Sequence, residues 1–112
     1  MKKVPFSALG KIRNDELVKA GETKKIFEFK IPSGYIGFLY KFANTWYLNT
    51  YLVLQVDGEI VQKIETRFTV TEPFRYETPV VVRHSIEVWA VNNSSEDHYF
   101  EFWIDGIAVE LE

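Results

Sequence analysis

Short segments in which apolar and polar side chains alternate are the feature that most limits how this 112-residue sequence can fold. In residues 24–31, Phe27, Phe29 and Ile31 share one side of an extended chain, and Ile26, Glu28 and Lys30 share the other. Because successive side chains of a β-strand point to opposite faces, a period of two predicts a half-buried strand. Further short, strand-like segments are expected at 35–42, 50–56, 59–64, 66–71, 79–83, 84–91, 98–104 and 107–111.

Turn residues separate these segments. Pro32-Ser33-Gly34 breaks the chain after the first segment, and residues 92–97 (NNSSED) form a polar cluster. Asp57-Gly58 and Asp105-Gly106 each stand between apolar segments, where Asp-Gly is a strong hairpin signal. Turn signals every 8–12 residues predict an all-β fold, an antiparallel, jelly-roll-like β-sandwich of about eight strands.

The apolar faces of these segments also predict the core of the sandwich, because the side chains that share a face point toward the same layer. The predicted core residues are Phe27, Phe29, Ile31, Ile36, Phe38, Phe42, Leu52, Leu54, Val56, Ile86, Val88, Phe100, Phe102 and Ile104. Strand order does not follow from these patterns.

Residues 1–20 differ from the rest and are predicted to form a basic N-terminal arm in front of a β-sandwich domain at 21–112. Pro5, Gly10 and four Lys/Arg in residues 1–13 are typical of a tail rather than of a core. Asn14 could cap a short helix over 14–20 that ends before Gly21. An extended strand over the same residues is an equal alternative, since seven residues are marginal for a helix.

The charges are polarised along the chain. Residues 1–30 hold eight Lys/Arg and four Asp/Glu, whereas residues 84–112 hold seven Asp/Glu and no Lys or Arg. A chain of this kind can pair its own ends, or it can pair end to end with copies of itself. Nucleic acid is not expected as a partner, because basic residues gather at the N-terminal end and acidic ones would repel phosphate.

The sequence shows no arrangement of side chains that predicts enzymatic activity, a metal or a cofactor. His84 and His98 have no second histidine or cysteine at ligand spacing. Asp57 and Asp105 are explained by the turns that their glycines predict. The longest apolar run, residues 35–40, is far shorter than the roughly 20 residues that span a bilayer, and no secretion signal is recognisable.

Aromatic side chains on the outer sides of two segments predict a contact surface. If Val88 and Phe102 face the core, then Trp89, Tyr99 and Trp103 face away from it. Exposed aromatic patches usually mark an interaction site, although a bulge or a covering loop could also bury these rings. We therefore expect a homo-oligomer, preferably a head-to-tail trimer. Its arm would contact a neighbour through Lys2, Lys3, Phe6, Lys11 and Arg13.

A carbohydrate-binding module is the competing interpretation. Sandwich folds can present aromatic rings as platforms on which sugars stack, with amide groups beside them. The residues that could form such a platform are Asn44, Trp46, Tyr47, Asn49 and Tyr51.

The stretch from 21 to 111 resembles the small single jelly-roll or β-sandwich proteins in virions of tailed phages and related viruses. The similar segments are residues 20–23 (AGET), 31–37 (IPSGYIG), 44–47 (NTWY), 49–51 (NTY), 56–58 (VDG) and 103–106 (WIDG). The resemblance implies a non-enzymatic structural protein that decorates or cements a capsid, or another virion subunit. It would be made in the host cytoplasm, and a major capsid protein would be a further partner.

Overall fold

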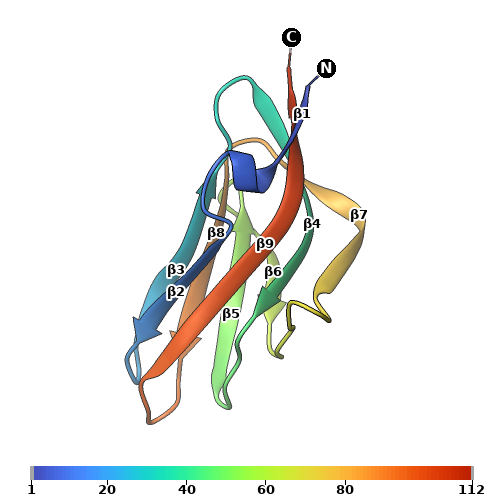
Figure 1. Cartoon of the computed structure of the whole chain (residues 1–112). Coiled ribbons are helices and arrows are strands. Elements are labelled where there is room, and N and C mark those ends of the chain that lie inside the picture. Colours follow the sequence, from blue (N-terminus) through green and yellow to red (C-terminus); the bar gives the residue numbers. More distant parts are fainter. Residues whose placement is uncertain (1, 112) are drawn as a thin grey trace.

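The computed structural model describes residues 2–111 and shows two packed antiparallel sheets (Figure 1). The predicted all-β sandwich is confirmed. The elements are β1 Lys3–Pro5, the 3-10 turn η1 Phe6–Ala8, β2 Arg13–Val18, β3 Thr23–Lys30, β4 Tyr35–Asn44, β5 Thr50–Val56, β6 Glu59–Ile64, β7 Phe74–Val82, β8 Ser85–Asn92 and β9 His98–Glu110.

Each sheet is built around a strand from the C-terminal part of the chain. In sheet A the strand order is β1-β9-β4-β7, and β2 pairs with the other end of β9. In sheet B the order is β3-β8-β5-β6. The molecule is elongated along the strands, with extents of 50 × 25 × 21 Å. Each sheet therefore has one face toward the core and one face toward the outside.

Cross-sheet contacts close the two sides of the sandwich. On one side the Asn14 amide of β2 donates a hydrogen bond to the Ile26 carbonyl oxygen of β3 at 2.8 Å. On the other side the Tyr76 hydroxyl of β7 donates to Oε1 of Gln62 on β6 at 2.7 Å. Burial raises the pKa of Tyr76 to about 12, so this hydroxyl remains a donor at neutral pH.

Twelve of the fourteen predicted core residues are buried between the sheets. The exceptions are Ile36 and Phe38, which are only half-buried. Other buried apolar side chains were not predicted as core: Phe6, Val18, Ile26, Leu39, Ala43, Ile64, Val82, Ala90 and Ala108.

A β-bulge explains the exceptions on β4. In the ladders that β4 forms with β7 and β9, the register shifts between Leu39 and Lys41. The extra residue, Tyr40, reverses the alternation, because two residues on the bulged strand then oppose one on its partner. Leu39 consequently faces the core, whereas Ile36 and Phe38 face outward. The prediction of Ile36 and Phe38 as core residues was wrong for this reason.

The prediction of a second turn, at Asp105-Gly106, is also wrong. Strand β9 continues from His98 to Glu110 without interruption, and Gly106 pairs with Leu39 in its middle. A Cβ atom at Gly106 would clash with the carbonyl oxygen of Phe38 and with the ring of Phe6. This glycine therefore serves a close approach of side chain and backbone rather than a change of chain direction.

The N-terminal residues lie on the sandwich rather than in front of it. Strand β1 pairs with β9, and residues 13–18 form the edge strand β2, so the helical alternative is wrong. Phe6 is fully buried, and its ring centroid lies 4.8 Å from that of Phe29. A buried ring cannot reach a neighbouring subunit. The expectation that residues 1–13 form a tail with Phe6 as a contact is corrected accordingly.

The other predicted turn, at Asp57-Gly58, is confirmed, and the Asp57 side chain anchors it. Asp57 and Gly58 have φ angles of 55° and 83° in the two-residue loop between β5 and β6. The Asp57 carboxylate accepts hydrogen bonds from the backbone N–H groups of Arg83, His84 and Ser85 at 2.9, 2.6 and 3.0 Å. Burial alone would raise the pKa of Asp57, but these three donors together outweigh it and hold the pKa below the ordinary value of an aspartate.

We predict that Phe102→Ala and Phe38→Ala differ in their cost to folding. Phe102 is fully buried, so its truncation should lower the free energy of unfolding by about 3–5 kcal/mol. Phe38 faces outward, so its truncation should cost about 1 kcal/mol. Urea denaturation at low protein concentration measures both. Equal losses would contradict the register that the bulge imposes.

We also predict that Asp57→Asn destabilises the fold in a pH-dependent way. At pH 7 the loss should be about 1–2 kcal/mol, because three hydrogen bonds to a charged acceptor are weakened. The pKa of Asp57 is lowered by folding, so its contribution is fully present above the unfolded pKa of about 3.9. The difference between wild type and variant should shrink as the pH falls through the folded pKa. A difference that persists unchanged at pH 2 would exclude the charge as its cause.

Candidate contact surface on sheet A

The outward-pointing side chains of sheet A form a surface that we call the sheet A face. Along β9 the even-numbered residues from Phe100 to Ala108 are buried and the odd-numbered ones are not. The outward residues of β9 are Tyr99, Glu101, Trp103, Asp105, Ile107 and Val109. Cross-strand pairing places neighbours from β1, β2, β4 and β7 beside them in rows.

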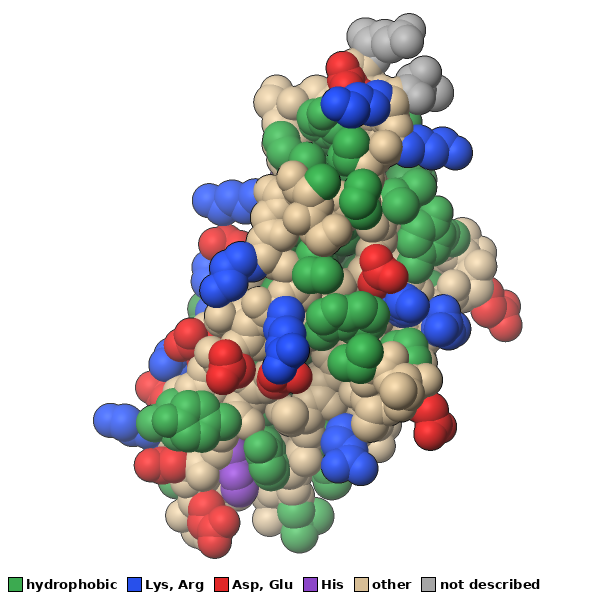
Figure 2. Space-filling view, viewed as in Figure 1, with side chains coloured by type: hydrophobic (Ala, Val, Ile, Leu, Met, Phe, Trp, Pro, Cys, Tyr) green, Lys and Arg blue, Asp and Glu red, His purple; other side chains and the backbone are tan. Residues whose placement is uncertain are grey.

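One row of this face is apolar across four strands. It consists of Pro5 on β1, Ile107 on β9, Phe38 on β4 and Val81 on β7. The adjacent row adds Val109 and Ile36. We call these six residues the apolar patch. Hydrophobic side chains gather over the upper parts of β4, β7 and β9 in Figure 2. An outer sheet face usually carries polar side chains, so this patch is the departure that needs an explanation.

Charged pairs lie below the apolar patch. The ammonium group of Lys41 on β4 lies 3.5 Å from the carboxylate of Asp105 on β9. The same ammonium lies 5.6 Å from the centroid of the Trp103 ring. One row further, Arg13 on β2 binds the carboxylate of Glu101 at 2.7 Å. The charges on this part of the face are therefore paired within the chain.

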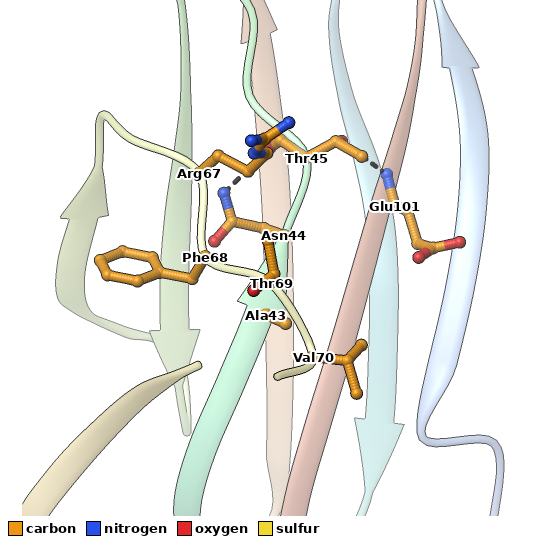
Figure 3. A pocket seen from close by; sticks show the side chains of 8 residues that line it. All are labelled: Ala43, Asn44, Thr45, Arg67, Phe68, Thr69, Val70 and Glu101. Atoms are coloured by element: carbon orange, nitrogen blue, oxygen red, sulfur yellow. Dashed lines mark hydrogen bonds between the residues drawn. The ribbon is translucent and has the colours of Figure 1, made fainter. Parts of the chain in front are cut away.

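A shallow hollow opens beside Ala43, the cross-strand partner of Trp103 (Figure 3). The segment after β6 forms one wall, and it is held to β4 by the backbone hydrogen bonds between Asn44 and Phe68 at 2.8 and 3.3 Å. Val70 on this segment is 59% exposed. The hollow is lined by Ala43, Asn44, Thr45, Arg67, Phe68, Thr69, Val70 and Glu101.

The three aromatic residues predicted as an oligomer interface do not lie together. Trp103 and Tyr99 point outward from sheet A, and Tyr99 is 64% exposed. Trp89 points outward from sheet B, on the opposite side of the sandwich. The Lys25 ammonium lies 6.0 Å from the centroid of the Trp89 ring. Period-two parity thus placed each ring on an outer face, but it could not show that there are two such faces.

The basic residues of the N-terminal segment have different surroundings. Lys2, Lys3 and Lys11 are exposed, whereas Arg13 is bound to Glu101 of β9. Lys25 similarly contacts Glu87 of β8 at 3.7 Å. These two ion pairs join the basic beginning of the chain to its acidic end. The polarised charges had allowed pairing within one chain or between copies, and these contacts are pairing within one chain.

The residues of the alternative glycan platform are also dispersed. Asn44 faces the core, and its amide donates to the carbonyl oxygens of Thr45 and Thr66. Tyr51 points outward from sheet B, where the Lys63 ammonium lies 4.3 Å from its ring centroid.

The remaining platform residues belong to the loop between β4 and β5. Trp46 donates its indole N–H to the Thr50 carbonyl oxygen at 2.9 Å, and Tyr47 stacks on His98 with centroids 3.9 Å apart. Asn49 has a φ of 64°, a conformation that suits asparagine in a tight turn. These side chains hold the loop together and do not form one flat platform with Asn44 and Tyr51.

Sequence reasoning missed most of the apolar patch. Ile36 and Phe38 were expected inside, and Pro5 and Val81 carried no signal of their own. Ile107 and Val109 could have been predicted from Trp103, because every second residue of a strand lies on the same face. This requires that β9 is recognised as one continuous strand.

Within residues 2–111, no cluster of three or more His, Cys, Asp or Glu side chains is arranged to hold a metal ion. No helix in that range is long and apolar enough to cross a membrane.

Comparisons with known proteins identify no family. No protein-family model matches the chain, and no curated protein matches it. Among solved structures, a chain in the structure of the infectious bursal disease virus Gx strain is similar to 97% of this chain, with a TM-score of 0.31 and 9% identity. The present chain spans 31% of the length of that viral chain.

Proposed function

We propose that this chain is a non-enzymatic structural protein that self-associates through the sheet A face, and that it acts as a decoration or cement subunit of a virion. The observation that carries the self-association is the apolar row of Pro5, Ile107, Phe38 and Val81 across four strands. Apolar side chains that gather in one patch and remain exposed or half-buried favour burial against a partner, because removing apolar area from water is favourable.

The size of the face supports a specific interface. Between the rows of Trp103 and Val109, four strands about 4.8 Å apart and about 20 Å long cover roughly 400 Å² of flat area. This is about half of the roughly 800 Å² per partner of a standard interface, and the outward residues of β2 and of the lower part of β9 extend the face further.

A structural rather than catalytic role is supported by how the reactive side chains are used. The Asp57 carboxylate is occupied by three backbone N–H groups, and His98 is stacked against Tyr47. The proposed virion location rests on the resemblance of residues 21–111 to small virion sandwiches.

We predict that the chain is larger than a monomer at high micromolar concentration, as measured by light scattering. Val109→Asp should weaken this association, because it places a carboxylate in the apolar patch. Val91→Asp is the matched control, since Val91 is also half-buried but points outward from sheet B. Circular dichroism checks that both variants fold. A wild type that stays monomeric, or variants with equal effects, would reject this surface.

The virion assignment makes a separate prediction. Particles of the virus that encodes the chain should contain many copies of it, as counted by quantitative mass spectrometry. Its absence from purified particles would exclude the decoration role without affecting self-association. A monomer that binds sugars on a glycan array would favour the carbohydrate-binding interpretation instead.

A further inference from the structure

We infer that the sheet A face binds a second copy of this chain about a two-fold axis that runs parallel to the strands and passes between β9 and β4. The inference rests on the proposed self-association and gives it a geometry. It follows from the pairing of outward residues on the two central strands of the sheet.

The two-fold axis places each outward residue of β9 opposite a particular residue of the second copy. Rotation by 180° about a line between β9 and β4 exchanges the positions of these two strands. Each residue of β9 in one copy then faces a β4 residue of the second copy. That β4 residue has the same number as the residue's cross-strand partner within its own sheet. The outward pairs are Val109 with Ile36, Ile107 with Phe38, Asp105 with Lys41 and Trp103 with Ala43.

The two upper pairs bring apolar side chains together. Ile107 would lie against Phe38 of the second copy, and Val109 against Ile36. The same axis places β1 opposite β7, so the exposed Pro5 faces Val81, which is 42% exposed. The centre of the interface would be dry, as in the packed layers of a β-sandwich.

The next pair brings opposite charges together. Asp105 of each copy would face Lys41 of the other, so four charges alternate in sign at the interface. A two-fold axis across the strands through the row of Ile107 would instead place Asp105 against Val109 and Lys41 against Ile36. That arrangement buries charges against apolar side chains, which is costly, and it is therefore excluded in favour of the axis along the strands.

The lowest pair sets a large side chain against a small one. Trp103 of each copy would face Ala43 of the other, next to the hollow that Val70 and Thr45 help to line (Figure 3). An aromatic ring seated in a pocket near the edge of an apolar centre is a typical anchor of a protein interface. Both anchors would be used at once, because the interface is symmetric.

The head-to-tail trimer expected from the sequence loses its two supports in this geometry. Trp89 and Trp103 lie on opposite faces, and two of the basic residues, Arg13 and Lys25, pair with acids of the C-terminal part of the same chain. A two-fold interface needs one self-complementary surface, and the sheet A face is such a surface.

Charge-reversal variants that are mixed with each other test the inference. Lys41→Asp alone and Asp105→Lys alone each place like charges across the axis, so the dissociation constant of each homodimer should rise about tenfold or more at low salt. A heterodimer of the two variants restores two opposite-charge contacts across the interface. The ion pair within each chain stays broken, so only a contact between copies explains the rescue. Native mass spectrometry separates the species by mass, and mixing should bring the affinity to within about threefold of wild type.

A matched pair on the other sheet provides the control. Lys25→Asp and Glu87→Lys break a similar ion pair on the outer face of sheet B, and neither variant nor their mixture should change dimerisation. A wild type that stays monomeric would overturn the proposed self-association together with this geometry. A wild type that assembles, with no gain on mixing the sheet A variants, would overturn the two-fold geometry alone.

Cysteine crosslinking covers the case in which a charge variant does not fold. The chain has no cysteine, so Ile107→Cys and Phe38→Cys introduce single reactive positions. Facing sheets pack about 10 Å apart, so a bis-maleimide of about 10 Å should join the two variants in a mixture. Val53→Cys with Val91→Cys, both on sheet B, should give no such product. Equal crosslinking of both mixtures would contradict the inference.

Discussion

Strand β9 holds the sandwich together, because it pairs with β1, β2 and β4 and supplies side chains to both faces of sheet A. Its inward residues Phe100, Phe102 and Ile104 are fully buried. Gly106 allows the Phe6 ring to close the core at its upper end. Because this strand runs for 13 residues without a break, its strict alternation fixes which side chains lie outside. The proposed contact surface is thus a direct consequence of the same strand that organises the core.

The bulge at Tyr40 determines the character of that surface. Without the extra residue, the upper part of β4 would keep the alternation set by Phe42, and Phe38 would face the core. With it, Phe38 and Ile36 join Ile107 and Val109 outside, and Leu39 takes the inner position. One inserted residue therefore moves two large apolar side chains from the core layer to the outer face. It also brings Lys41 into line with Asp105.

The sequence predicts the fold class and most of the core because period-two alternation depends only on neighbouring residues. The Asp57-Gly58 hairpin follows for the same local reason. Gly106 misleads because a close approach to Phe6 and a turn both favour glycine, and Phe6 is distant in sequence. The bulge, the pairing of β1 with β9 and the placement of Trp89 and Trp103 on different sheets all depend on long-range contacts. Local patterns carry no information about them, so the contact surface could be predicted only in part.

The self-complementarity of the sheet A face has a simple origin in antiparallel pairing. Two neighbouring strands favour cross-strand pairs that are apolar with apolar, acid with base, or large with small. A two-fold axis along the strands sets every residue opposite the same kind of partner that it has in its own sheet. In the proposed dimer, contacts that stabilise β9 against β4 within one chain would therefore be repeated between two chains, through Ile107 and Phe38 and through Asp105 and Lys41. An outward face with well-matched cross-strand pairs is in this way already suited to a second copy of itself.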